Sequence, residues 1–237
     1  MKPTIGTLSM FTFFIGLFIA SCKTSSTSDE SGAATDTTAI QSQAANPITI
    51  CMLNEAGIRD TPGESGKYLT TLYLSEQVTL IGDSAMATTS GKEYLYYKIQ
   101  LEDGKQGWVR KDFIAKDVVP AVFTAATSIN KRPDLASVTD KNFAAMDFVA
   151  TRPAKDNWVE VTGIPTGEKW FIKGYVHADN LTYDPTDVSF AALFKRASGM
   201  KDPEKGNAMM TQLRANKDLQ ASQFYASLFG GEEGTDY

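Results

Sequence analysis

The sequence is poor in the side chains that most metal and nucleophilic centres use. It contains one histidine, His177, and two cysteines, Cys22 and Cys51. A zinc site built from several histidine ligands is therefore excluded, and we expect no metal centre. Modification of Cys22 would leave Cys51 without a partner for an internal disulfide. Because Ile50 and Met52 flank Cys51, we expect a buried thiol that packs like a small hydrophobic side chain.

Several common catalytic motifs are also absent. The sequence has no Gly-x-Ser-x-Gly nucleophile elbow, no phosphate-binding loop and no dinucleotide fingerprint. A glycosidase that uses a single glutamate is not excluded by motifs, but the short β-rich runs do not match such a fold. We therefore expect a non-catalytic protein without a cofactor, and an unrecognised hydrolase is the weaker alternative.

Basic side chains are outnumbered. The chain has 23 Lys and Arg against 28 Asp and Glu, which gives a formal net charge of −5. Proteins that bind nucleic acid carry a basic patch or stripe, so we expect no nucleic-acid partner. After residue 22 no segment has the long uncharged apolar run of a transmembrane helix.

An apolar run does occur at residues 10–20, but it is too short to be a stable membrane anchor. Lys2 precedes it, and it ends in Ile-Ala-Ser-Cys at Cys22. This pattern resembles the lipobox of bacterial lipoproteins. The resemblance implies a signal peptide over residues 1–21 and lipid modification of Cys22. An ordinary secretory signal that happens to contain this cysteine is the alternative.

The lipid would be the protein's only attachment to the membrane of the cell envelope. Each buried methylene adds about 0.8 kcal/mol of membrane affinity, so two or three acyl chains give stable anchoring. Residues 22–47 are rich in Ser, Thr, Ala, Asp and Gln, and we expect a disordered tether. Lys23 stands where an aspartate would resemble an inner-membrane retention signal, which favours the outer membrane in a bacterium with two membranes.

From Ile48 the chain changes to short β-rich runs separated by turn residues. The predicted strands cover residues 48–53, 69–74, 77–81, 94–101 and a run that begins at Gly107. Between the last two, Glu-Asp-Gly-Lys at 102–105 predicts a hairpin, because Gly104 can take a positive φ without a Cβ clash. Short strands at this spacing indicate a small β-barrel.

Three short motifs recur in the same order later in the chain. The paired segments are 56–62 with 128–133, 96–99 with 158–161, and 107–114 with 174–181. The spacings between the motifs differ, so the loops must differ between the copies. The recurrence predicts two copies of one unit, at 48–117 and 118–184.

The first copy contains Gly-Ile-Arg-x-x-Pro, then Tyr-Tyr-Lys-Ile, then Asp-Gly-Lys-x-Gly-Trp-Val. These motifs resemble a bacterial SH3-like domain over residues 48–117. Residues 121–184 are loosely similar, with Asn-Lys-Arg-Pro in place of the first motif and Tyr175 in place of the tryptophan. The resemblance implies two tandem small SH3-like β-barrels, the second divergent. It also implies binding of cell-wall peptides or targeting of a neighbouring enzyme to the wall.

Residues 185–237 have a helical pattern. Phe190, Leu193, Phe194 and Ala197 share one helical face before Gly199. Asp-Pro-Glu at 202–204 predicts the start of a second helix, and residues 218–229 a third. Residues 232–237 form an acidic tail. We therefore expect a mainly β protein with a short α-helical C-terminal region.

Alternation along the strands places aromatic pairs on the outer faces of both copies. If Ile99 and Val109 face the core, Tyr96 and Trp108 face outward, and the same reasoning applies to Trp158 and Tyr175 in the second copy. Such pairs can form platforms for sugars, prolines or peptide side chains. The alternative is that they pack against the other copy or the helices.

Arg59 and Asp60 lie in the first predicted loop, where they could bind the carboxylate and the amine of a peptide. An ion pair that holds the loop is the alternative. Cys51 and His177 lie in different copies, so we do not expect them to form a catalytic pair. The sequence thus indicates non-catalytic binding of cell-wall (peptidoglycan) peptide at the envelope. The alternative is a surface or periplasmic scaffold that binds a protein or a host molecule and has no wall ligand.

Overall fold

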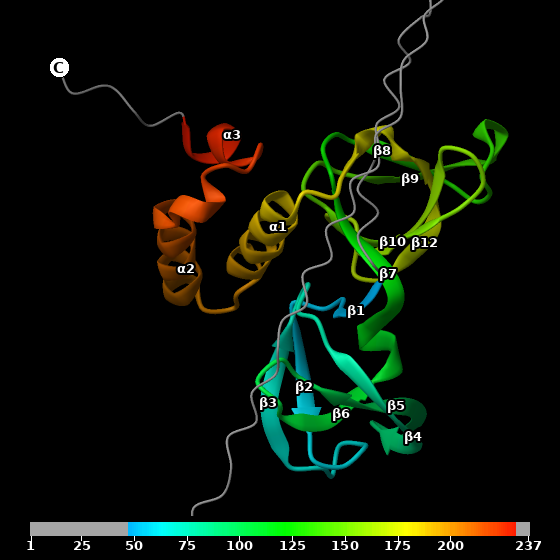
Figure 1. The fold of residues 1–237 in the computed structure, drawn as a ribbon, viewed down its shortest axis with the longest axis vertical. Helices are drawn as coiled ribbons and strands as arrows, with labels where there is room; N and C mark the ends of the chain where they lie inside the picture. Colours follow the sequence, from blue (N-terminus) through cyan, green and yellow to red (C-terminus); the bar gives the residue numbers. More distant parts are fainter. Residues whose placement is uncertain (1–46, 231–237) are drawn as a thin grey trace, which may run out of the picture. The chain divides into compact units, whose positions relative to one another are not determined.

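The structure is a computed structural model that describes residues 47–230 (Figure 1). The predicted signal peptide, Cys22, the tether up to residue 46 and the acidic tail lie outside the described residues. The described chain is mainly β, with two sheets followed by C-terminal helices, as the sequence predicts. Within residues 47–230 neither sheet closes into a complete barrel.

The first sheet has five strands in the order β3-β2-β6-β5-β4. These strands are β2 (Glu55–Arg59), β3 (Tyr68–Tyr73), β4 (Thr79–Thr89), β5 (Lys92–Gln100) and β6 (Gln106–Arg110). The predicted hairpin between β5 and β6 is confirmed: Gly104 has φ +83°, and the amide of Leu101 donates to Lys105 O at 2.8 Å. Strand β4 is longer than predicted, because after an irregularity around Gly82 it continues to pair with β5.

The second sheet has the path β1-β7-β10-β11-β12-β8-β9, with β13 beside β7. Its strands are β1 (Ile48–Cys51), β7 (Ile114–Phe123), β8 (Thr127–Asn130), β9 (Val138–Phe143), β10 (Phe148–Pro153), β11 (Trp158–Gly163), β12 (Ile172–His177) and β13 (Leu181–Thr182). Short 3₁₀ turns, η1 (Lys111–Phe113) and η3 (Ala178–Asn180), follow β6 and β12 respectively.

The two sheets share a strand order. The path β3-β2-β6-β5-β4 of the first corresponds to β9-β8-β12-β11-β10 of the second. The register agrees as well, because Arg59 pairs with Trp108 in one and Asn130 with Tyr175 in the other. The motifs that recur in the sequence therefore occupy equivalent places in the two sheets.

Strand β7 takes part in both units. Its first half pairs with β1, as in Cys51 with Ile114, and its last residues pair with β13, as in Phe123 with Leu181. Strand β1 also reaches the start of β4 through a single bridge between Ile50 and Gln77.

Two of the three predicted helices are confirmed with their caps. Helix α1 (Pro185–Ser198) ends at Gly199, and α2 (Pro203–Ala215) starts after the N-cap Asp202. The predicted third helix is wrong for most of its length, since only η4 (Lys217–Leu219) and α3 (Tyr225–Phe229) form. The cause is a buried carboxylate on α1: Asp187 accepts the hydroxyl of Ser222 and the amide of Gln223, which takes that amide out of a helical ladder.

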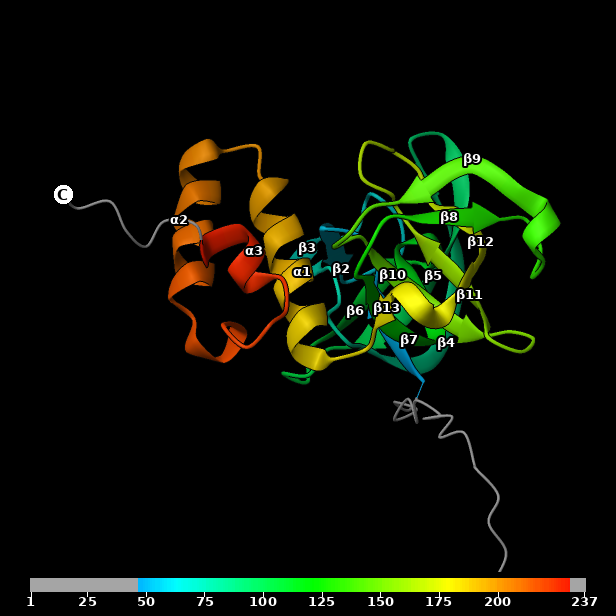
Figure 2. The same cartoon turned by 90° about the horizontal axis from the view of Figure 1, so that it is seen from above.

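Helix α1 contacts both sheets. The Arg196 guanidinium lies 3.3 Å from the ring centroid of Tyr73 in β3, whereas Lys195 Nζ donates to Ile164 O in the β11–β12 loop at 2.8 Å. Figure 2 shows α1 between α2 and the strands. A core cluster under α1 joins Ile50, Val122 and Phe190, from β1, β7 and α1. No helix within residues 47–230 is long and apolar enough to cross a membrane.

Candidate functional site

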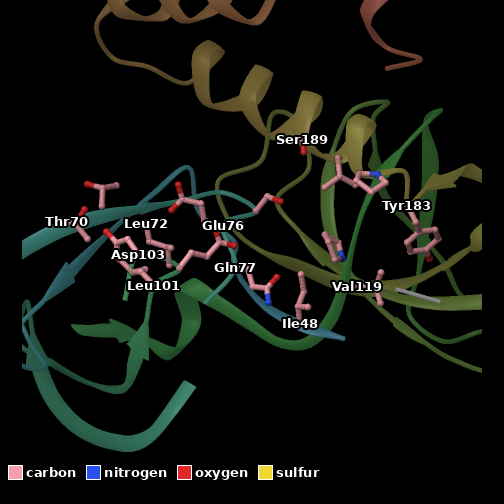
Figure 3. A pocket seen from close by; sticks show the side chains of 16 residues that line it. Ile48, Thr70, Leu72, Glu76, Gln77, Leu101, Asp103, Val119, Tyr183 and Ser189 are labelled. Atoms are coloured by element: carbon pink, nitrogen blue, oxygen red, sulfur yellow. The ribbon is translucent and has the colours of Figure 1, made fainter. Parts of the chain in front are cut away.

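A cavity of about 700 Å³ lies where the two sheets and α1 meet (Figure 3). Ligand sites of small molecules commonly have volumes of this size. One side of the cavity consists of β3, the β3–β4 turn and the β5–β6 hairpin. The other side consists of β7, the residue after β13 and the first turns of α1.

Different side chains line the two ends of the cavity. Figure 3 shows Thr70, Leu72 and Asp103 towards one end and Val119 and Tyr183 towards the other. The lining also includes the aliphatic side chains of Ile48, Leu101 and Val188. The walls thus offer apolar surface together with a small number of polar groups, which is the usual character of a specific ligand site.

The charged groups of the lining all have one sign. Glu76, Glu102 and Asp103 supply carboxylates, and none of the described lining residues is Lys, Arg or His. Asp103 is partly compensated by Lys105, whose Nζ lies 2.6 Å from its Oδ2, and this hydrogen bond lowers the pKa of Asp103. Glu102 forms no ion pair with any residue in 47–230. A concave surface with carboxylates and no cation favours a positively charged ligand.

Glu76 has a structural role as well. Its Oε2 accepts the amide of Tyr73 at 3.0 Å, and the Glu76 amide donates back to Tyr73 O at 3.0 Å. Together these bonds fix the turn after β3, where Ser75 has a positive φ of 72°. The carboxylate is therefore held at a defined place beside the cavity while its second oxygen stays available.

Tyr183 contributes a hydroxyl at the far end. Burial raises the pKa of Tyr183, and a hydrogen bond with Thr151 opposes part of this shift. Since the pKa lies above its usual value, the phenol stays protonated at neutral pH. Tyr183 can therefore donate or accept a hydrogen bond but adds no charge.

The predicted aromatic platforms need correction. Tyr96 and Trp158 are only 6 % and 8 % exposed. Strand pairing places Arg110 beside Tyr96 and His177 beside Trp158, and the Tyr96 hydroxyl lies 2.5 Å from Thr89 Oγ1 on β4. Trp158 lies edge-on to His177 at 4.5 Å between centroids.

The other two aromatic residues of that prediction are half-buried. Trp108 pairs with Lys98 and Tyr175 with Glu160, so each lies diagonal to the aromatic residue it was predicted to accompany. Alternation along a strand predicts which face a side chain occupies. It does not predict which residue lies opposite on the neighbouring strand. Neither Trp108 nor Tyr175 lines the cavity.

Arg59 and Asp60 hold the β2–β3 loop. Arg59 donates from Nη1 to Gly66 O at 2.5 Å, and Asp60 accepts the amide of Lys67 at 2.7 Å. The alternative of an ion pair between them is wrong, because within residues 47–230 each bonds loop backbone instead. Neither residue lines the cavity.

Cys51 is a fully buried thiol, as predicted, and it is not in a disulfide. Burial raises its pKa to about 12, so the thiol stays protonated at neutral pH. His177 instead contacts Trp158 and lies 3.5 Å from Asp179. Residues 47–230 contain no group of three or more His, Cys, Asp or Glu side chains that could hold a metal ion.

The residues of the cavity were not found by sequence reasoning. They come from turns, three strands and a helix that are far apart in the chain, and no motif links them. The only local signal was the hairpin at Gly104, which places Glu102 and Asp103.

Comparisons with known proteins add little to this site. No protein-family model matches the sequence, and no curated protein is significantly similar to it. Two solved structures from Trichomonas vaginalis resemble the chain, NlpC2 with 16 % identity and NlpC1 with 15 %, each with a TM-score of 0.24. The matches cover 65 % and 62 % of this chain and 54 % and 49 % of those chains, so the chain spans about half their length. At this score the likeness carries no argument about fold or activity.

Proposed function

We propose that this protein is a non-catalytic lipoprotein of the cell envelope that binds cell-wall peptide in the cavity between its two sheets. The observation that carries the proposal is the lining: three carboxylates and no basic side chain among its described residues, in a cavity of about 700 Å³. Peptides of the wall carry free amines, which such a lining attracts.

Two SH3-like units are part of the proposal. The repeated strand order and the matching registers of Trp108 and Tyr175 support it. The sharing of β7 between the units supports it further, since the last strand of one then serves as the first strand of the next. In this arrangement the binding site belongs to the junction of the units and not to the aromatic face of either one.

The chemistry of the lining fits a short peptide. Glu76 and Glu102 can bind an ammonium group, Leu72 and Leu101 offer apolar contacts, and Tyr183 can bond a backbone carbonyl. Each of these interactions is reversible and none activates a nucleophile, so the expected outcome is binding without cleavage.

Retention on purified peptidoglycan sacculi tests the proposal. The soluble chain 23–237 should bind, and Ser189→Trp should lose binding because an indole at this lining position fills the cavity. Ser198→Trp is the matched control, on the same helix but outside the cavity. Failure of the parent to bind at moderate salt would overturn the proposal and favour a scaffold role with a protein partner. Release of wall fragments by the parent would overturn the non-catalytic part.

Anchoring through Cys22 is proposed from the lipobox pattern and is tested separately. Cells that express the full chain should incorporate labelled palmitate into the protein, and Cys22→Ser should abolish the label. In a bacterium with two membranes the parent should fractionate with the outer membrane. A labelled Cys22→Ser variant, or an unlabelled parent, would contradict lipid anchoring.

A further inference from the structure

Strand β3 is an edge strand that lies against the cavity. Within the described chain it pairs with β2 on one side only, because it is the last strand of its sheet. Thr70, Thr71 and Leu72 of this strand line the cavity. An edge strand presents amide and carbonyl groups that can pair with another extended chain.

The outward backbone groups can be assigned from the register. Strands β2 and β3 pair without interruption from Thr70 to Tyr73. The Tyr73 amide donates to Glu76 Oε2 at 3.0 Å, so it points away from β2. Residues two apart in a strand direct their backbone groups to the same edge, and the amide and carbonyl of Thr71 therefore point outward too.

The carboxylates near the outer edge of β3 favour one kind of peptide. Glu76 lies in the turn after β3, and Glu102 and Asp103 lie on the β5–β6 hairpin, and all three carboxylates line the cavity together with β3. An extended peptide placed along β3 would bring its side chains next to these carboxylates. A peptide with a primary amine is complementary to them, whereas an acidic peptide would be repelled.

We propose that the ligand binds as an extended peptide added to the outer edge of β3, with backbone hydrogen bonds to Thr71 and a primary ammonium group beside Glu76 and Glu102. This inference rests on the proposed function and defines its binding mode. Strand addition takes affinity from main-chain bonds and specificity from neighbouring side chains. It also explains why a site without an exposed aromatic platform can hold a peptide.

Thr71→Pro tests the backbone contact, because proline removes the outward amide and is tolerated on edge strands. Thr71→Val is the matched control, since it keeps the amide. The probe is a synthetic wall-type tetrapeptide with one lysine, measured by calorimetry. Thr71→Pro should bind about tenfold more weakly, as expected for loss of one backbone hydrogen bond, and Thr71→Val within about twofold of the parent.

Two kinds of peptide modification make the test independent of folding in the proline variant. Acetylation of the lysine amine should weaken binding to the parent protein. N-methylation of the peptide backbone amides, one at a time, should weaken binding at alternate positions only. Equal binding of Thr71→Pro and the parent, or tolerance of every N-methyl group, would overturn strand addition while leaving the proposed function intact. An absence of peptide binding to the parent would overturn both.

Discussion

At the scale of the residue, the Asp187 carboxylate holds the C-terminal segment against α1. It is only 4 % exposed and accepts hydrogen bonds from Thr182, Ser222 and both the amide and the side chain of Gln223. Burial alone would raise the pKa of Asp187, but these hydrogen bonds outweigh it and the pKa is lowered.

Asp187→Asn should lower the free energy of unfolding by about 1–3 kcal/mol at neutral pH, because an amide cannot accept all four bonds. A carboxyl whose folded pKa is lowered stabilises the fold fully above its unfolded pKa, and this contribution is lost as the pH falls through the folded value. Urea unfolding between pH 7 and pH 2 should therefore show a smaller loss of stability for the variant. If the free energy of unfolding fell equally with pH in the parent and in Asp187→Asn, this role would be contradicted. Asp156→Asn, at an exposed position, is the control.

Cys51 allows a second test at the residue scale. In the chain 23–237 it is the only cysteine, and its pKa is raised to about 12 by burial. We expect no reaction with a thiol reagent at pH 8 in the native protein and full reaction in guanidinium, because the reactive species is the thiolate. Rapid labelling under native conditions would contradict this burial and show that the core cluster around Cys51 opens.

At the scale of the element, two glycines mark equivalent strand contacts. A Cβ on Gly107 would lie 2.4 Å from Ile58 Cγ2, and a Cβ on Gly174 would lie 2.3 Å from Ile129 Cγ2. Backbone carbonyls lie close as well, at 2.9 Å in both cases. Strands β6 and β12 can approach their neighbours this closely only without a side chain at these positions.

Gly107→Ala and Gly174→Ala should each cost about 1–3 kcal/mol of stability, since the added methyl overpacks a close contact. Gly57→Ala is the matched control within a strand, because its Cβ would meet its nearest neighbour at an ordinary 3.9 Å. Chemical denaturation of the three variants measures the difference. Equal stabilities would show that the two strand contacts do not constrain the fold.

The elements differ in how far the sequence predicts them. The hairpin at Gly104, the end of α1 at Gly199 and the start of α2 at Asp202 depend on local chemistry, and each is visible in a few residues. The segment around Ser222 has a helical pattern, yet it is bent by a carboxylate 35 residues earlier in the chain. The cross-strand neighbours of Tyr96 and Trp158 likewise depend on the strand register, which their local sequence does not specify.

At the scale of the whole described chain, the cavity depends on contacts between distant segments. Arg196 and Lys195 of α1 contact the first sheet and the β11–β12 loop respectively, and Ile48 and Val119 come from paired strands. A composition or motif analysis cannot predict such a junction. The recurring motifs do predict the equivalent strands of the two sheets, but the ligand-binding residues predicted from alternation lie outside the cavity.

In the proposed function the carboxylates of the cavity bind an amine-bearing wall peptide. The most direct measurement is the affinity of the lysine-containing tetrapeptide for the double variant Glu76→Gln/Glu102→Gln. A second double variant, Glu93→Gln/Glu204→Gln, changes the net charge equally at exposed positions outside the cavity. We predict that the cavity variant binds at least about tenfold more weakly than the parent, as for loss of a charge-assisted contact, and that the control stays within about twofold. Equal affinities of the two double variants would contradict the account.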